Sequence, residues 1–136
     1  SVKVPALAVD PDAKKIAAAA SAKAQAEGWN VVIAIHDNGG NLVYLERADG
    51  TQLGSIIVAQ EKSSTALRFK RPTKVLEDTV LAGRVHMMSL PGITSVEGGL
   101  PLVVDGEVVG SIGVSGVQSS QDGQVAAARA AALAAG

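Results

Sequence analysis

Two turn sequences, each lying between runs of apolar residues, constrain the fold of this 136-residue chain more than any other feature. Asp105-Gly106 is a favoured pair for the type I′ turn of a two-residue β-hairpin, and it separates strand-like segments at residues 100–104 and 107–115. Asp37-Asn38-Gly39-Gly40 is a second turn sequence, between a β-branched run at residues 29–35 and a strand-like segment at 41–47. The chain is therefore predicted to form two β-hairpins. The first strand is expected to be covered on both faces, because polar residues do not alternate along it.

Helices are predicted before, between and after these hairpins. Asp10-Pro11-Asp12 has the residue types of a helix N-terminus, and the alanine-rich segment that follows ends at Gly28. Residues 54–70 have helical spacing up to Pro72, and Thr73 can cap a short helix that reaches residue 81 or 82. Residues 119–122, Ser-Ser-Gln-Asp, resemble a capping box before an alanine-rich terminal helix.

The resulting order, α-β-β-α-α-β-β-α, predicts the α/β class in its α+β form, with one antiparallel sheet and helices packed on it. No repeat, linker or low-complexity tail divides the chain, so residues 1–136 are expected to form a single domain. Only 2% of the residues are aromatic, so small aliphatic side chains must build the core. A core of this kind often gains from burial between subunits, and we therefore expect a homo-oligomer.

Composition and charge argue against several classes of function. A net charge of −1, from 12 basic and 13 acidic residues, gives no basic field for nucleic acid or anionic lipid. The chain has no cysteine, which excludes disulfides, thiolate catalysis and cysteine-based zinc sites. No apolar run reaches the ~18 residues of a membrane span, and the first residues lack the features of a signal peptide. We expect a soluble protein without nucleic-acid or membrane partners, and we favour the cytoplasm over export. Whether a leader peptide was removed before Ser1 stays open.

Glu97 is the candidate catalytic carboxylate. It precedes Gly98-Gly99 in a glycine-rich loop directly before the second hairpin, and glycines allow a backbone to approach a ligand closely. Partial burial would raise the pKa of Glu97 and make it a general acid or base, whereas an exposed Glu97 would be an ordinary loop residue. Gly98 and Gly99 are accordingly candidate ligand-binding residues.

The two histidines, His36 and His86, are candidate acid–base groups and candidate metal ligands. His36 lies beside Asp37, which can fix the tautomer of the imidazole, and the alternative is a turn histidine that bonds the hairpin. His86 precedes Met87-Met88, so this segment offers two kinds of side chain that bind haem iron. The alternative for this segment is a surface histidine next to core methionines.

Lys62 and Arg71 are candidate ligand-binding residues near the C-terminal end of the second predicted helix. They can anchor a carboxylate or propionate, or they can serve only to complement the helix dipole. We expect Glu97 and Gly98-Gly99 to border a pocket, with Arg71 or Lys62 at its polar end and a histidine as the titrating partner.

Six short segments occur in the order in which a known family carries them. They are Lys62-Ser63-Ser64-Thr65-Ala66, Arg71-Pro72-Thr73, Leu90-Pro91-Gly92, Glu97-Gly98-Gly99-Leu100-Pro101, Asp105-Gly106 and residues 109–116. With them nearly the whole chain resembles the GlcG/HbpS family of small haem-binding and related proteins, which includes the C-terminal domain of the PduO adenosyltransferases. The resemblance implies a profilin-like or GAF-like α/β sandwich, a homo-oligomer that is often tetrameric or octameric, and haem or corrinoid binding at subunit surfaces.

Two functions of different class are consistent with these residues. The resemblance implies a small-ligand-binding oligomer that takes haem or another tetrapyrrole, with His36 and His86 as the available iron ligands. The alternative is a cofactor-independent catabolic enzyme, an isomerase, lyase or hydratase, in which Glu97 and a histidine exchange protons with a small apolar oxygenated substrate. A closed aliphatic cavity around Glu97 would favour the enzyme, whereas a flat surface would favour binding or assembly.

Overall fold

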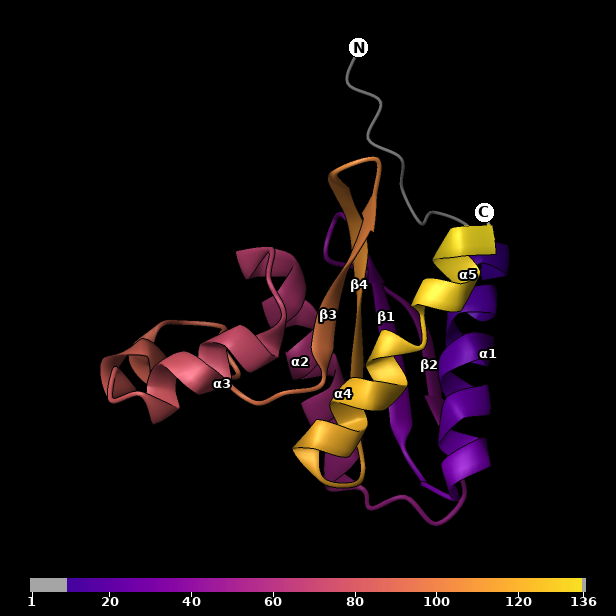
Figure 1. Ribbon diagram of the computed structural model, residues 1–136, viewed down its shortest axis with the longest axis horizontal. Coiled ribbons are helices and arrows are strands. Elements are labelled where there is room, and N and C mark those ends of the chain that lie inside the picture. Colours follow the sequence, from indigo (N-terminus) through magenta and orange to yellow (C-terminus); the bar gives the residue numbers. More distant parts are fainter. Residues whose placement is uncertain (1–9, 136) are drawn as a thin grey trace.

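A four-stranded antiparallel sheet forms the centre of the protein, which a computed structural model describes over residues 10–135 (Figure 1). The spatial order of its strands is β2-β1-β4-β3, so the two hairpins meet along β1 and β4. The strands are β1 (Val32–Asp37), β2 (Leu42–Arg47), β3 (Gly99–Val104) and β4 (Glu107–Ser115). The predicted α+β class and both antiparallel hairpins are confirmed.

Both hairpin turns have the chemistry that the sequence indicates. Asp105 and Gly106 have φ values of 51° and 79°, as both central residues of a type I′ turn require. In the first turn, Oδ1 of Asp37 accepts hydrogen bonds from the backbone N–H groups of Gly39 at 2.9 Å and Asn41 at 3.0 Å. Each turn is therefore stabilised by residues within it, which is why short-range sequence signals identify it.

The first strand begins three residues later than predicted, at Val32, because the preceding residues complete a helix end. Helix α1 (Asp10–Glu27) ends at Gly28, whose φ of 74° is left-handed. The N–H of Trp29 donates to the carbonyl of Ala24 at 2.9 Å, and the N–H of Gly28 donates to that of Gln25 at 3.1 Å. This is the Schellman arrangement, which satisfies helix carbonyls and delays the strand.

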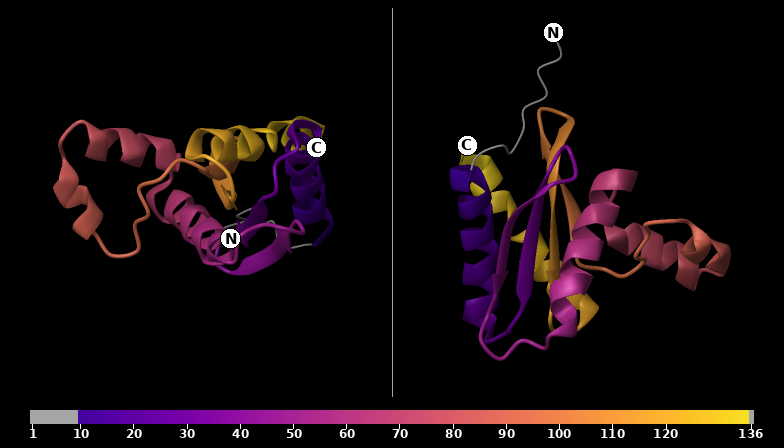
Figure 2. Two further views of the ribbon diagram at one scale, coloured as in Figure 1. Left: turned by 90° about the horizontal axis from the view of Figure 1, so that it is seen from below. Right: turned by 180° about the vertical axis from the view of Figure 1, so that it is seen from behind.

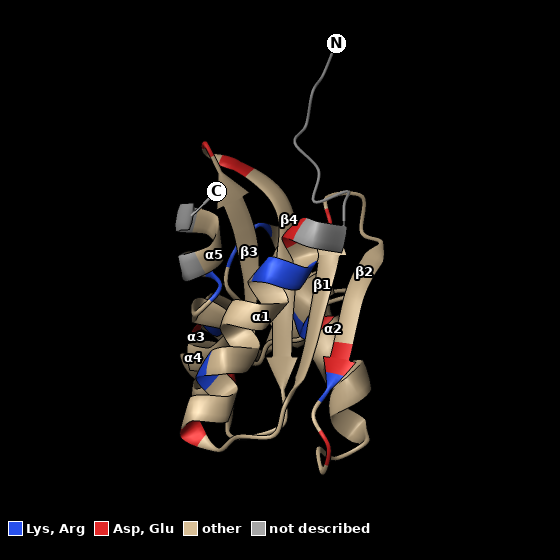
Figure 3. Ribbon diagram, turned by 90° about the vertical axis from the view of Figure 1, so that its right-hand side faces the viewer, with Lys and Arg blue, Asp and Glu red and all other residues tan. Residues whose placement is uncertain are grey.

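Helices cover both faces of the sheet (Figure 2). On one face lie α1, α4 (Ser119–Ala127) and α5 (Ala130–Ala135), and on the other lies α2 (Gly54–Phe69). Basic and acidic residues are interspersed on the side that carries α1, in keeping with a net charge near zero (Figure 3). No helix within residues 10–135 combines the length and apolar character needed to cross a membrane.

The main apolar core lies between the sheet and the pair α1 and α4. Strand residues that point to this face interleave with alanines and an isoleucine spaced three or four apart along α1, as a core-facing helix stripe requires. These buried residues are Ala13, Ile16, Ala17, Ala20, Ala24, Ile33, Ile35, Leu102, Ile112, Val114 and Val125. Small aliphatic side chains therefore do build the core, as the low aromatic content predicts.

The backbone of helix α2 packs directly against the opposite face, where two glycines leave room for it. A Cβ on Gly113 of β4 would overlap the carbonyl oxygen of Ala59, and one on Gly99 of β3 would overlap that of Lys62. Overlaps this severe with backbone atoms cannot be relieved by a side-chain rotation. These two glycines are thus required by packing between helix and sheet.

Residues 73–96 form a projection that we call the arm, which extends from the sheet at the left of Figure 1. It contains α3 (Thr73–Leu81) and a 3₁₀ helix, η1 (Val85–Ser89), that the sequence analysis does not predict. Within α3 only Thr73 and Leu76 are buried. Thr73 does not cap the helix as predicted, because its Oγ1 accepts a hydrogen bond from the N–H of Gly99 at 2.8 Å and so ties the arm to β3.

The terminal helix differs from the prediction at its start and in its middle. A capping box is present, but one residue earlier than predicted: the N-cap is Gln118 rather than Ser119, and its N–H donates to Oε1 of Gln121 at 3.2 Å. Asp122, the acid predicted to complete the capping box, instead accepts hydrogen bonds from Lys62 and from the N–H of Val117. The helix also divides into α4 and α5 instead of continuing as one element.

Candidate functional site

A polar layer lies buried between α2 and the sheet. Along β4, Ser111 and Ser115 face α2. Ile112 and Val114, which lie between them in the sequence, belong to the apolar core on the other face. Oγ of Ser115 donates to Oγ of Ser55 on α2 at 3.2 Å. The alternation of side chains along a strand produces this separation of polar and apolar faces.

His36 lies within this layer, at the end of β1, with both ring nitrogens next to serine hydroxyls. Nδ1 is 2.7 Å from Oγ of Ser63, which is itself 2.8 Å from Oγ of Ser111 on the neighbouring strand. Nε2 is 3.4 Å from Oγ of Ser64. Ser63 and Ser64 are successive residues of α2, so one turn of that helix holds the imidazole on both sides.

Burial favours the neutral form of the His36 imidazole. His36 is only 5% exposed, and burial lowers the pKa of its imidazole from 6.5. Asp37 and Glu61 act in the opposite direction, and Arg68 adds to the lowering. Asp37, which the sequence suggests as the group that fixes the tautomer, forms its hydrogen bonds within the turn, and the serines contact the ring instead.

Lys62 is buried in the interior, at 1% exposure, and its ammonium forms an ion pair. Nζ donates to Oδ2 of Asp122 on α4 and to the carbonyl of Val114 on β4, both at 3.0 Å. Oδ1 of Asp122 also accepts from the N–H of Val117 at 3.1 Å. Burial raises the pKa of Asp122 above its usual value, and Lys62 acts against that rise. The pair joins α2 to α4, which lie on opposite faces of the sheet.

The glycine-rich loop lies directly over this ion pair. Gly98 has a φ of 135°, and a Cβ at that position would come within 2.8 Å of Nζ of Lys62 and 2.6 Å of the carbonyl oxygen of Val114. Gly98 and Gly99 do allow a close approach, but it is made to Lys62 and β4 of the same chain, and their role in binding a ligand stays a prediction.

Glu97 lies beside this loop and faces α4. Its N–H donates to Oε1 of Glu77 on α3 at 3.2 Å, and its carboxylate lies against Gly123, where a Cβ would overlap it. Glu97 and His36 are on opposite sides of β4, because Glu97 precedes β3 and His36 belongs to β1. The acid–base role of Glu97 with a histidine stays a prediction.

Arg71 and His86 are both exposed. Nε of Arg71 donates to the carbonyl of Phe69 at 2.9 Å, just after α2. His86 lies on η1 in the arm, where Nη2 of Arg84 is 3.5 Å from its Nε2. The structure thus brings together Lys62 with Gly98 and Gly99, and it separates His86 from the sheet that carries His36.

Sequence reasoning missed Ser63, Ser111 and Asp122 as partners of the predicted residues. The alternation of Ser111 and Ser115 with apolar residues along β4 is a signal for a polar face that could have identified the layer. No local signal connects Asp122 with Lys62, which lies 60 residues earlier in the chain. Among residues 10–135, no group of three or more histidine, aspartate or glutamate side chains is arranged to hold a metal ion.

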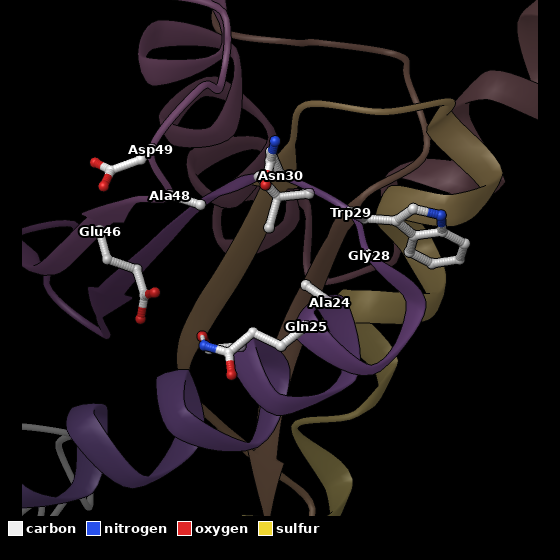
Figure 4. Close-up of a pocket in the computed structure, with 10 residues that line it drawn as sticks. Ala24, Gln25, Gly28, Trp29, Asn30, Glu46, Ala48 and Asp49 are labelled. Atoms are coloured by element: carbon white, nitrogen blue, oxygen red, sulfur yellow. Dashed lines mark hydrogen bonds between the residues drawn. The ribbon is translucent and has the colours of Figure 1, made fainter.

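A surface cleft of about 440 Å³ lies between the C-terminal end of α1 and the end of β2 (Figure 4). Gln25 from α1 and Glu46 from β2 approach the same space in this view. None of the predicted site residues lines the cleft, and its charged lining residues are both acidic. The polar lining residues are Ser21, Gln25, Asn30, Glu46 and Asp49. An anionic ligand is disfavoured there.

Comparisons with known proteins agree with the fold described above. Residues 10–131 match the model of the HbpS-like family, which is described as "Haem degrading protein HbpS-like". Protein GlcG of Escherichia coli strain K12 is 45% identical over 103 residues, which cover 76% of this chain and 77% of GlcG.

Two solved structures are similar over nearly the whole chain. A double mutant of HbpS from Streptomyces reticuli has a TM-score of 0.88 at 33% identity, covering 98% of this chain and 90% of HbpS. The crystal structure of a PduOC–haem complex has a TM-score of 0.83 at 30% identity, covering 93% of this chain and 94% of PduOC. The resemblance inferred from six sequence segments is confirmed: this chain belongs to the HbpS-like family.

Proposed function

We propose that this protein binds haem on the arm, with His86 as the iron ligand. The observation that carries the proposal is an exposed imidazole in the middle of exposed apolar side chains. His86 lies on η1, and around it in the sequence of the arm Leu81 is 76% exposed, Val85 57% and Met88 59%. Single exposed apolar residues are ordinary on a protein surface, whereas several on one short segment indicate a binding surface.

The residues of the arm fit the three requirements of a haem site. Iron needs a nitrogen or sulfur ligand, the macrocycle needs an apolar surface, and the propionates need cations. His86 and Met88 offer ligands, Leu81 and Val85 offer apolar surface, and Arg84 lies beside His86. When bound, haem would supply an iron centre that an imidazole or thioether could ligate.

Two other places within residues 10–135 fit this group less well. His36 is enclosed by α2 and the sheet, and both of its ring nitrogens already contact serine hydroxyls. The cleft beside α1 carries Glu46 and Asp49, which repel propionates. The arm is therefore the place where this chain can present a histidine to a large flat ligand.

Membership of the HbpS-like family supports the ligand class. The family model is described as that of a haem degrading protein, and the similar PduOC structure is a complex with haem. Both statements concern relatives, and the proposal for this chain depends on the arm.

Titration with hemin, followed by the Soret band, tests the proposal. We expect wild-type protein to shift the band, His86→Ala to lose the shift that ligation produces, and His36→Gln to retain it. Metal-free protoporphyrin IX, followed by its fluorescence, tests the apolar surface without ligation: His86→Ala should still bind it, and Leu81→Glu should not.

Two outcomes would contradict the proposal. A wild-type spectrum that equals free hemin would show that the protein does not bind haem. A shift that survives in His86→Ala and disappears in a folded His36→Gln variant would assign the iron to β1 and remove the role of the arm.

A further inference from the structure

We infer that Ser64 and His36 form an acid–base pair, in which Ser64 is a nucleophile toward small carboxylic esters. The inference begins from the hydroxyl and imidazole cluster on α2, which the proposed haem site on the arm does not use. Oγ of Ser64 is 3.4 Å from Nε2 of His36, and Oγ of Ser63 is 2.7 Å from Nδ1 on the other side of the ring. A nucleophile (Ser64), a base (His36) and a group that orients the base (Ser63) are thus linked by successive contacts.

The hydrogen bonds beyond the ring define which tautomer is reactive. When Nδ1 carries the proton, it donates to Oγ of Ser63, and Ser63 in turn donates to Oγ of Ser111 at 2.8 Å. Nε2 then presents its lone pair to the hydroxyl of Ser64. Ser63 and Ser111 are fully buried, so this chain of hydroxyls positions the imidazole away from competing water.

Ser64 is the member of the cluster that a small molecule can reach. It is half-buried, whereas His36, Ser63 and Ser111 are buried. Glu61 and Arg68 lie three residues before and four residues after Ser64, which places them near it along the surface of α2. The guanidinium of Arg68 would attract an ester that also carries a carboxylate.

The chemical step is an acyl transfer. Oγ of Ser64 forms a bond to the carbonyl carbon of the ester, and its proton passes to Nε2 of His36. The bond from that carbon to the leaving oxygen breaks, and the alkoxide or phenolate leaves with the electron pair. Ser64 lies inside a helix whose N–H groups are already bonded, so no pair of backbone donors is free to stabilise the oxyanion. We therefore expect Ser64 to be acylated once and the acyl group to be released from it only slowly.

The experiment treats the whole protein with p-nitrophenyl acetate and locates the acetyl group by peptide mass spectrometry. Ser120 is exposed on α4 and has no histidine contact, so it is the internal control. A positioned general base contributes about 10²-fold or more, so we expect Ser64 to react at least tenfold faster than Ser120. His36→Gln should reduce the rate at Ser64 to that of Ser120.

A second variant and a pH profile keep the inference testable if His36→Gln does not fold. Ser63→Ala retains the imidazole but removes its orienting partner, and it should slow acetylation of Ser64 while leaving Ser120 unchanged. The wild-type rate should rise with pH through a value below 6.5 and then level, because neutral His36 is the base. Asp37, Glu61 and Arg68 also act electrostatically on the ring, and Glu61→Gln measures how much of the pH profile comes from Glu61.

Equal acetylation of Ser64 and Ser120 in wild-type protein would overturn the inference. So would a folded Ser63→Ala variant with an unchanged rate and pH profile, because the cluster would then act only as packing between α2 and the sheet. Neither result affects haem binding by the arm, so failure here is distinguishable from failure of the proposed function.

Discussion

The buried ion pair between Lys62 and Asp122 should make Lys62→Met one of the most destabilising substitutions in this chain. Methionine keeps the length of the side chain but removes the ammonium, which donates to Asp122 and to the carbonyl of Val114. The carboxylate of Asp122, buried to the same extent, is then left without a counter-ion. The cost comes from this stranded charge more than from the lost attraction.

Removing one partner of a buried pair typically costs about 3–5 kcal/mol. For a domain of this length, that corresponds to a fall in Tm of roughly 10–20 °C. It is also a large part of the roughly 5–15 kcal/mol that stabilises a typical domain. Urea unfolding followed by circular dichroism measures the change in the free energy of unfolding directly.

The size of this cost should depend on pH in a direction that the structure determines. Burial already raises the pKa of Asp122 above 3.8, and Lys62→Met removes the charge that opposes the rise. The folded variant therefore binds a proton at Asp122 more tightly than the unfolded chain does. The stability conferred by that proton is present below the pKa of Asp122 in the unfolded chain. It is lost as pH rises through the pKa of Asp122 in the folded variant. The loss of unfolding free energy relative to wild type should therefore be larger at pH 7 than at pH 5.

The double variant Lys62→Met/Asp122→Asn is the matched control. Asparagine removes the stranded charge, and its carbonyl oxygen can still accept from the N–H of Val117. We expect it to be more stable than Lys62→Met by at least about 1 kcal/mol at pH 7. A Lys62→Met variant within about 1 kcal/mol of wild type, or a deficit unchanged by Asp122→Asn, would refute the reasoning.

Three further predictions rest on packing, burial and exposed apolar surface. Gly113→Ala should cost about 1–3 kcal/mol or more because its Cβ overlaps the carbonyl of Ala59, whereas Gly54→Ala, with open space at its Cβ, should be neutral or stabilising; urea unfolding compares them. Because burial lowers the pKa of His36, the free energy of unfolding should fall as pH decreases through 6.5 toward that lower value, and His36→Gln should remove this part of the profile. Sedimentation equilibrium at tens of micromolar should show a multiple of 13.7 kDa, since apolar side chains such as Ile57 on α2 are exposed, and a single 13.7 kDa species would contradict the expected homo-oligomer.

The elements that the sequence predicts well are those whose signals lie within a few residues. Asp105-Gly106 determines its turn through its own backbone preferences, and Gly28 ends α1 for the same reason. The prediction fails where a distant residue competes for the same group. Thr73 does not cap α3, because its hydroxyl bonds to Gly99, and Asp122 does not complete a capping box, because it pairs with Lys62.

The candidate site is less predictable than the fold because its geometry depends on contacts between distant segments. Lys62 has polar neighbours in the sequence and is expected near a ligand, yet the close approach of α2 to Gly98 buries it. The two histidines are similar as sequence features, but one is enclosed between helix and sheet and the other is exposed on the arm. Only the packing of α2 against β4 distinguishes them.

The Soret band of the hemin-treated His86→Ala variant, recorded beside wild type and His36→Gln, tests the central claim most directly. The arm as the haem-binding surface predicts a ligand-induced shift in wild type and in His36→Gln, and the loss of that shift in His86→Ala. An identical shift in all three proteins would show that neither histidine binds the iron, and it would contradict the account.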